Sequence, residues 1–173
     1  MIDSYFNRLT DVLDTLDREN IQVIANIIRA TNIDKGSVYV FGNGGSATTA
    51  SHFAQDMNKT LSYRFVCLND NIPSLLAYGN DVGFESIFKL QLEKLIGAGD
   101  LVIGISCSGN SENVLSALEY ANMIGCPTIG FAGYDGGKLK YFTDYCLHVP
   151  SFDMQICEDC HLILTHIIMK LLQ

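Results

Sequence analysis

Short apolar runs alternate with segments of helical periodicity along most of this chain. The apolar runs are Val38–Phe41, Phe65–Leu68, Leu101–Ile105, Thr128–Phe131 and Tyr145–Val149. Helical patterns lie between them, at about Ser46–Asn58, Phe84–Ile96, Asn113–Ile124 and Lys138–Phe142. This alternation is typical of a parallel sheet flanked by helices. The sequence therefore predicts an α/β fold.

Helical segments also begin and end the chain. Two amphipathic stretches, about Tyr5–Leu16 and Ile21–Thr31, come first, and a long segment of roughly Met154–Leu172 comes last. The last segment is apolar on most sides, and such a helix is usually buried in the core or against another subunit. A chain of 173 residues without repeats or linkers is about one domain long. We expect a single domain over residues 1–173, with N-terminal helices over 1–35 and an α/β core over 36–173.

Composition excludes several kinds of partner. The net charge of −8 argues against nucleic acid as a ligand, because backbone phosphates attract basic surfaces. No apolar run approaches the ~20 residues of a membrane span. The first residues, Met1–Ser4, lack the basic start and apolar stretch of a secretory signal. We therefore expect a cytoplasmic protein with no membrane partner, whose six cysteines are buried free thiols.

Two strand-to-helix junctions carry residues suited to binding an anion. Val38–Phe41 runs into Gly42-Asn43-Gly44-Gly45-Ser46, and Leu101–Ile105 runs into Ser106-Cys107-Ser108-Gly109-Asn110-Ser111. A helix that starts at such a turn presents unpaired N–H groups and the positive end of its dipole. The alternative is that Ser106, Ser108 and Ser111 only cap the following helix. One serine suffices for a cap, so three hydroxyls favour an oxyanion such as a phosphate group.

These junctions match no nucleotide-binding signature. No Gly-Lys-Ser/Thr follows Gly45, and 42–46 lacks the spacing of a dinucleotide fingerprint. In open α/β sheets, ligands bind at the carboxyl ends of the strands, where both loops are expected to lie. A small phosphate ester therefore fits the two loops better than a nucleotide.

Several motifs in the same order resemble the sugar isomerase (SIS) domain family. They are Gly42-Asn43-Gly44-Gly45-Ser46 with His52-Phe53-Ala54, then Gly79-Asn80-Asp81 with Gly83-Phe84, then Gly104-Ile105-Ser106-Cys107-Ser108-Gly109-Asn110-Ser111. Within that family, the sequence is most similar to isomerases that interconvert sedoheptulose 7-phosphate and D-glycero-D-manno-heptose 7-phosphate for surface polysaccharides. The resemblance implies a three-layer αβα sandwich around a five-stranded parallel sheet. It also implies a homotetramer with active sites between subunits.

The resemblance further assigns roles to individual residues. It implies that Ser106, Cys107, Ser108 and Ser111 hold the phosphate, and that Asn43, Gly44, Gly45, Asn80, Asp81 and Glu158 contact the sugar. Zinc is frequent in the family, and the positions that match its ligands are His52, Asp56, Glu158 and His166. Three positions depart from the family pattern, which has Glu at Asp56, Gln at Glu158 and Thr at Cys107.

The residues at the proposed metal positions can also perform acid–base chemistry. His52 and Asp56 are four apart and share one helix face, and Glu158 and His166, eight apart, share another. Aldose–ketose interconversion needs a base near carbon and an acid near oxygen. We expect Asp56 or Glu158 to be the base and His166 the acid.

Simpler alternatives remain for each group. His52 and Asp56 could be an ordinary surface pair, and Cys157-x-x-Cys160 lacks the second ligand pair of a zinc ribbon. His161 lies on a different face from His166 and is expected to be structural. For the whole chain, the alternatives to this isomerase are a non-catalytic SIS regulator or scaffold that binds sugar phosphate, and an isomerase of another sugar phosphate.

Overall fold

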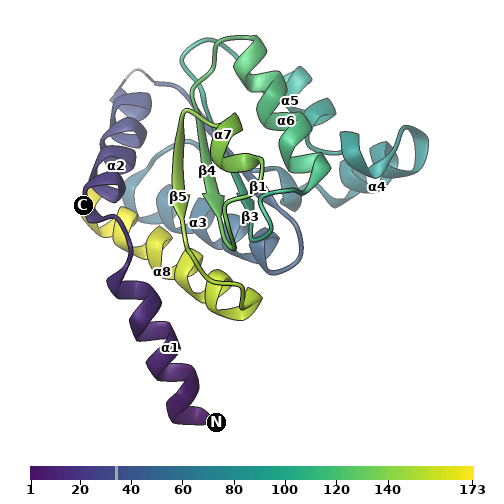
Figure 1. Ribbon diagram of the computed structural model, residues 1–173. Coiled ribbons are helices and arrows are strands. Elements are labelled where there is room, and N and C mark those ends of the chain that lie inside the picture. Colours follow the sequence, from purple (N-terminus) through teal and green to yellow (C-terminus); the bar gives the residue numbers. More distant parts are fainter. Residues whose placement is uncertain (34) are drawn as a thin grey trace.

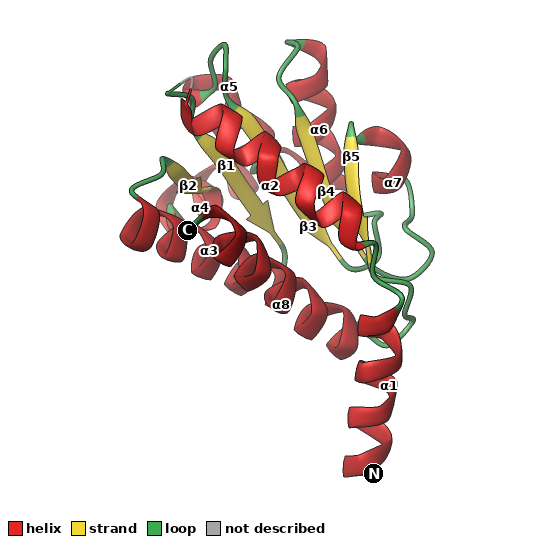
Figure 2. Ribbon diagram, turned by 90° about the vertical axis from the view of Figure 1, so that its left-hand side faces the viewer, coloured by secondary structure: helices red, strands yellow, loops and turns green. Residues whose placement is uncertain are grey.

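A five-stranded sheet forms the centre of the molecule. The computed structural model describes residues 1–33 and 35–173. The strands are β1 (Val38–Gly42), β2 (Phe65–Cys67), β3 (Leu101–Ser106), β4 (Thr128–Ala132) and β5 (Tyr145–His148). Their order is β2-β1-β3-β4-β5, and every neighbouring pair is parallel (Figure 2). The predicted α/β fold with a five-stranded parallel sheet is confirmed.

Helices cover both faces of the sheet. The α-helices are α1 (Ile2–Asp14), α2 (Arg18–Ile33), α3 (Gly45–Leu61), α4 (Ile72–Asp81), α5 (Lys89–Leu95), α6 (Glu112–Met123), α7 (Leu139–Phe142) and α8 (Met154–Leu172), and the 3₁₀ turns are η1 (Leu68–Asp70) and η2 (Phe84–Ser86). One core joins the sheet to α2, α3 and α8, and the other joins it to α5, α6 and α7. The helix layers on either side are visible in Figure 1. The result is the expected three-layer sandwich.

Strand β1 shows why the apolar runs are continuous. Val38 and Val40 belong to the core beneath α2, α3 and α8, whereas Tyr39 and Phe41 belong to the core beneath α5 and α6. Successive side chains of a strand point to opposite faces, so a strand covered on both sides needs apolar residues at every position. The burial of all five residues of β1 agrees with this.

Helix α4 is the main element that the sequence analysis did not predict. It begins after Asn71, whose Oδ1 accepts a hydrogen bond from the N–H of Ser74 at 3.3 Å, and Pro73 occupies its first turn. None of its residues is fully buried, although Leu75 and Tyr78 pack partly against the core beneath α5 and α6. The helix predicted over 84–96 is shorter than expected, because 84–86 form the turn η2 and α5 starts at Lys89.

The first helix stands away from the rest of the protein. In Figure 1, α1 projects from the sandwich and contacts it mainly through α8. The Tyr5 hydroxyl donates a 2.6 Å hydrogen bond to Asp159, and Arg8 forms a 2.8 Å ion pair with Asp153. That residues 1–173 form one domain stays a prediction, for which one cooperative unfolding transition would be the signature.

Among the described helices, none is both long and apolar enough to cross a membrane. The last helix, α8, starts and ends at the residues predicted from the sequence. Its buried residues face α2 and α3.

Candidate functional site

The two loops singled out in the sequence lie side by side at the carboxyl edge of the sheet. Strands β1 and β3 are neighbours, with Gly42 paired to Ile105, so the segments that follow them meet. Between these segments is a cavity of about 340 Å³. Its walls are Asn43, Gly44, Gly45, Ser46, Ile105, Ser106, Cys107, Ser108, Ser111, Tyr134, Met154 and Glu158. The starts of α3 and α6 therefore contribute to one cavity.

The serine loop, residues 106–111, gathers its three hydroxyl groups. The Oγ of Ser106 lies 3.0 Å from the Oγ of Ser111 and 3.4 Å from that of Ser108. Ser111 is the N-cap residue of α6, but its side chain makes no capping hydrogen bond. Ser108 Oγ accepts a 3.2 Å hydrogen bond from the N–H of Asn110 within the loop, and none of the three hydroxyls caps α6, which favours the ligand interpretation. Free backbone N–H groups at a helix start and clustered hydroxyls suit a phosphate group.

A left-handed glycine shapes this loop. Gly109 has a φ of +64°, and a Cβ at this position would collide with the carbonyl oxygen of Gly136 in the following loop. Its carbonyl accepts a 2.9 Å hydrogen bond from the N–H of Leu139. Glycine is required here because the serine loop turns sharply against the backbone of 133–138.

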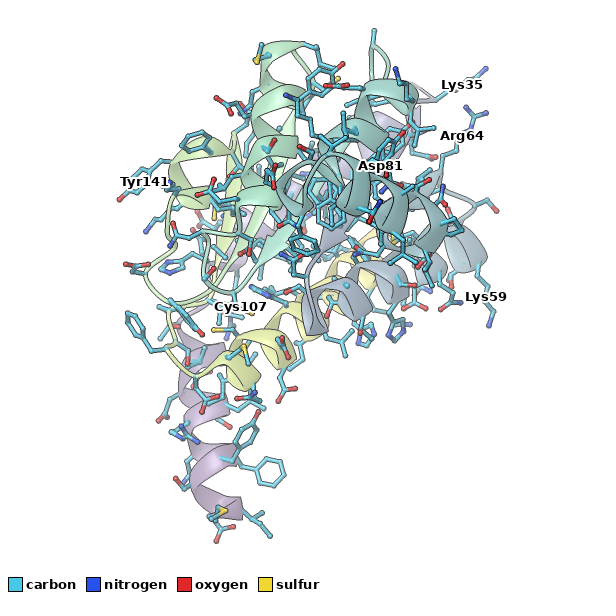
Figure 3. The ribbon with its side chains drawn as sticks, turned by 90° about the vertical axis from the view of Figure 1, so that its right-hand side faces the viewer. Lys35, Lys59, Arg64, Asp81, Cys107 and Tyr141 are labelled. Carbon is cyan, nitrogen blue, oxygen red and sulfur yellow. The ribbon has the colours of Figure 1, made fainter. Side chains whose placement is uncertain are left out.

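Cys107 lies within the serine loop, close to the junction with α3 and α8 (Figure 3). Its side chain is buried, and its Sγ is 4.0 Å from the Oγ of Ser46. A hydrogen bond with Cys157 and burial raise the pKa of the Cys107 thiol, so it is uncharged at neutral pH. An uncharged thiol adds no repulsion toward a bound anion. All six cysteines are free thiols, as expected, and five of them are buried, whereas Cys146 is only partly buried.

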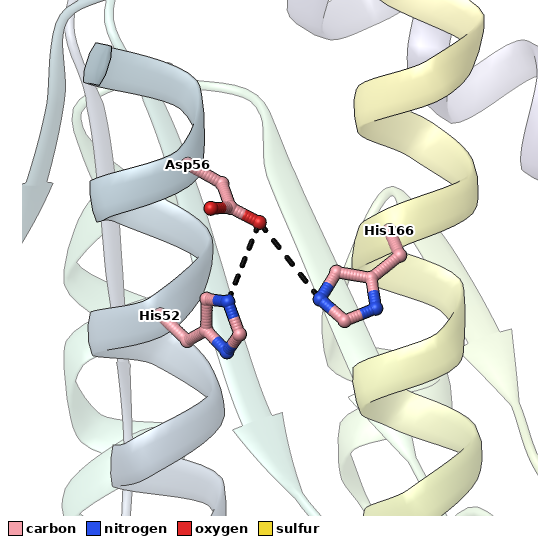
Figure 4. Close-up of side chains that lie close together, drawn as sticks. All are labelled: His52, Asp56 and His166. Carbon is pink, nitrogen blue, oxygen red and sulfur yellow. Dashed lines mark ion pairs between the residues drawn. The ribbon is translucent and has the colours of Figure 1, made fainter. Parts of the chain in front are cut away.

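A second group of polar side chains, the histidine cluster, consists of His52, Asp56 and His166. Asp56 Oδ2 lies 3.4 Å from His52 Nε2 and 3.8 Å from His166 Nε2. The rings of the two histidines are edge to face, with centroids 5.1 Å apart. Figure 4 shows α3 supplying His52 and Asp56 while α8 supplies His166. The residues are partly exposed, with Asp56 the least exposed at 21 % of its side chain.

One ligand atom from each member of the cluster lies within 4.8 Å of the others. The group comprises three of the four residues expected at the metal. The fourth, Glu158, lies outside it, against the start of α3: a Cβ at Gly45 would overlap the Glu158 carboxyl group. A carboxylate is favoured there by the positive end of the helix dipole. Glu158 therefore belongs to the wall of the cavity between the two loops rather than to the histidine cluster.

Sequence comparison identifies the family. The profile of the SIS domain family matches residues 4–133. The chain belongs to this family. It is 39 % identical to the phosphoheptose isomerase of Aquifex aeolicus, over 90 % of this chain and 84 % of that protein. It is also 39 % identical to the phosphoheptose isomerase of Syntrophotalea carbinolica, over 99 % and 92 % of the two chains. The structure of the phosphoheptose isomerase from Neisseria gonorrhoeae superposes with a TM-score of 0.92 at 31 % identity, covering 99 % of this chain and 96 % of that one.

The remaining residues expected to touch the sugar are near the end of α4. Asn80 lines a second cavity of this SIS domain, about 550 Å³ in volume, which shares Asn43 and Gly44 with the first. Its amide donates a 2.8 Å hydrogen bond to Asp81 Oδ1. Asp81 is exposed on the outside of α4. Figure 3 shows Lys59 and Arg64 pointing outward.

Two asparagines that hold the glycine loop (residues 42–46) of this SIS domain were not predicted. Asn69 accepts a 3.1 Å hydrogen bond from Gly42 N–H and donates a 2.9 Å bond to Gly42 O. Asn113, in the first turn of α6, exchanges two hydrogen bonds with Asn43. Asn113 lies two residues after the serine loop, so its closeness to the loop could be read from the sequence. Its pairing with Asn43 could not, because Asn43 comes from another loop.

His161 is structural, as predicted, and His148 is the last residue of β5. His161 is fully buried beside Phe131, and burial lowers its pKa to about 4. His148 Nε2 lies 3.0 Å from the carbonyl oxygen of Tyr134. Neither residue belongs to the histidine cluster.

Proposed function

We propose that this protein interconverts sedoheptulose 7-phosphate and D-glycero-D-manno-heptose 7-phosphate. Its curated relatives, at 39 % identity over most of the chain, are phosphoheptose isomerases, so the enzyme class is phosphosugar isomerase. The observation that carries the mechanism is the approach of Asp56 to His166, from two different helices, within 3.8 Å. A carboxylate beside an imidazole supplies the base and the acid that an aldose–ketose isomerase needs on adjacent atoms.

The phosphate group belongs in the cavity of the serine loop. The three hydroxyls of Ser106, Ser108 and Ser111 and the N–H groups at the start of α6 are suitable donors, and Cys107 contributes its backbone. Asn43, Gly44, Gly45, Asn80, Asp81 and Glu158 are the proposed contacts of the sugar. Holding the phosphate at a distance from the histidine cluster orients the chain of carbon atoms between them. A substrate held in this way keeps its reacting carbon atoms next to the base and the acid, which raises the rate of the chemical step.

Asp56 is the better of the two candidate bases. Both imidazoles approach its Oδ2, which leaves Oδ1 free to accept a proton from carbon (Figure 4). Glu158 is not paired with an imidazole in this way. The 3.8 Å separation of His166 Nε2 from Asp56 Oδ2 exceeds a hydrogen bond, so the ring nitrogen can turn its proton to a substrate oxygen.

Asp56 and His166 each move one proton in each half of the reaction. Asp56 Oδ1 removes a proton from C1 of the open-chain ketose, the electron pair forms the C1=C2 bond, and His166 protonates the oxygen on C2. The enediol returns to the aldose when Asp56 delivers its proton to C2 and the hydroxyl on C1 gives its proton to His166. Both side chains end in their starting states.

The histidine cluster also fits zinc. Two imidazole nitrogens and a carboxylate oxygen are donors that zinc accepts, and three protein ligands leave a position for substrate. As the alternative to direct proton transfer by Asp56 and His166, we propose that His52, Asp56 and His166 hold zinc, with Glu158 outside the set. Bound there, zinc would polarise the substrate carbonyl.

The proposal includes a homotetramer in the cytoplasm. Exposed apolar side chains on α1 and around α4 support association between subunits, since large exposed apolar patches mark interaction sites. They are Ile2, Phe6, Ile72, Leu76, Val82 and Phe84, each about 60 % exposed or more. Light scattering at micromolar concentration is the test, and a monomer would contradict the tetramer.

The activity itself is tested with a panel of ketose phosphates in D₂O, followed by NMR. We expect aldose product from sedoheptulose 7-phosphate, with deuterium at C2 if the transferred proton exchanges with solvent. Binding of sugar phosphates without any aldose product would contradict the isomerase and favour the regulator or scaffold.

A further inference from the structure

The glycine loop and the start of α6 are joined by a pair of asparagine side chains. Asn43 Nδ2 donates to Asn113 Oδ1 at 2.8 Å, and Asn113 Nδ2 donates to Asn43 Oδ1 at 2.9 Å. Two such bonds in parallel fix both the distance and the relative orientation of the amide planes, which one bond cannot do. The side chains thus form a bridge between the two walls of the cavity.

Burial makes this bridge rigid. Asn113 is 2 % exposed, and its Oδ1 also accepts a 3.0 Å hydrogen bond from the N–H of Val114. A buried amide that lost a partner would leave an unpaired polar group, which is costly. Rotation of Asn113 away from Asn43 is therefore opposed by its surroundings.

The bridge leaves part of Asn43 available to a ligand. Asn43 is only partly buried, and it lines both cavities. After pairing with Asn113, its amide keeps one N–H and one lone pair. Asn113 lines neither cavity and has no contact with the ligand space.

We propose that Asn113 is a positioning residue for the isomerisation. Through Asn43 it holds the glycine loop in register with the serine loop, so that the sugar bound by one wall keeps a fixed place relative to the phosphate bound by the other. This inference rests on the proposed function, because it assumes that Asn43 and Gly44 contact the sugar. Displacements of about 1 Å at such positions can cost on the order of 100-fold in rate.

Asn113→Asp changes the bridge at a single atom. The introduced carboxylate still accepts from Val114 N–H and from Asn43 Nδ2, and a negative charge in the first turn of α6 is favoured by the helix dipole. What it lacks is the donor to Asn43 Oδ1. The new carboxylate is buried and one of its oxygens faces Asn43 Oδ1, so we expect the melting temperature to fall. In protein that is still folded at the assay temperature, kcat for sedoheptulose 7-phosphate should fall about 10- to 100-fold. Affinity for inorganic phosphate should fall less than kcat, since the serine loop keeps its hydroxyls and backbone while the added charge lies two residues beyond Ser111.

The matched control lies on the same helix. Asn122, near the end of α6, donates a 2.6 Å hydrogen bond from Nδ2 to Phe142 O. Asn122→Asp removes a donor of the same kind at a place that lines neither the phosphate cavity nor the Asn80 cavity. Its kcat should match that of the wild-type protein.

A double-mutant cycle completes the test. If Asn113 acts through Asn43, then Asn43→Ala combined with Asn113→Asp should be no slower than Asn43→Ala alone. Independent, multiplicative losses in kcat would overturn the proposal, as would Asn113→Asp with wild-type kcat.

The proposed function is judged on the wild-type protein alone, by whether it forms aldose from sedoheptulose 7-phosphate. If it forms none, the proposed isomerase activity is wrong. The role of the Asn43–Asn113 bridge is then tested by the same double-mutant cycle, measured as affinity for sedoheptulose 7-phosphate. Non-additive losses of affinity would support it, and additive losses would remove it.

Discussion

The serine loop and the histidine cluster are built from different parts of the chain. The serine loop is one continuous segment after β3, and its hydroxyls meet within 3.0–3.4 Å because a tight turn brings them together. The histidine cluster requires α3 to pack along α8, and its members are partly exposed. The first is therefore fixed by local sequence, and the second by the packing of two helices that are distant in sequence.

This difference suggests a division of labour. Backbone N–H groups and short hydroxyls at the strand ends hold an anion without moving protons at neutral pH. The cluster contains the groups that can take up and release protons. Changes in the loop should therefore act mainly on substrate affinity, and changes in the cluster mainly on the rate of the chemical step.

Asp56→Asn should have the largest effect. Removing a general base lowers rate by roughly 10²- to 10⁴-fold, and we expect a fall in kcat of that size. Affinity for the substrate should change little, because the phosphate is held in the other region. Stopped assays and calorimetry on the same protein measure the two effects separately.

The control for this change is Asp159→Asn, also an isosteric loss of a carboxylate. Asp159 is on α8 but pairs with the Tyr5 hydroxyl of α1, away from the histidine cluster. It should keep its kcat. If Asp56→Asn retained more than about a tenth of wild-type kcat, the base would have to be another residue.

Ser108→Ala and Ser111→Ala should have the next largest effect, on affinity. A hydrogen bond to a charged group contributes about 1.5–3 kcal/mol, which corresponds to roughly 10- to 150-fold weaker binding of sugar phosphate. Ser116→Ala, one helical turn further along α6, is the control and should bind normally. Unchanged affinity in both single variants and the double variant would remove the loop from the site.

The contrast between the regions also explains what the sequence could predict. The apolar strands were placed within one or two residues, since burial on both faces leaves an unbroken signal. Helix α4 was not predicted, although Asn71 and Pro73 are residues that favour a helix start. The serine loop could be recognised from its own residues. The place of Glu158 could not, because it depends on how far α8 is shifted along α3.

Glu158→Gln should have a smaller effect on rate and tests whether the phosphate cavity supplies a base. The family pattern that this sequence resembles has Gln at this position, so a neutral amide should still contact the sugar. We expect kcat to stay within about tenfold, with the loss of a favourable charge at the start of α3 as the main cost. Complete loss of activity would instead make Glu158 the base and move the chemistry from the histidine cluster to the cavity wall.

His161 offers the smallest expected effect on activity and the sharpest contrast within one helix. It lies five residues before His166 on α8, but it is fully buried, and neither ring nitrogen has a hydrogen-bond partner among the described residues. Burial lowers its pKa from 6.5 to about 4 in the folded protein. Between those values the unfolded chain binds a proton that the folded chain does not, so acidification favours unfolding, by up to about 1.4 kcal/mol per pH unit.

His161→Leu removes this group and should flatten the fall in unfolding free energy between pH 6.5 and 4, while kcat at neutral pH stays as in the wild type. Urea unfolding at a series of pH values measures the slope. An unchanged slope in the variant would show that other groups cause the acid sensitivity, and a large loss of kcat at neutral pH would connect this buried histidine to the chemistry after all.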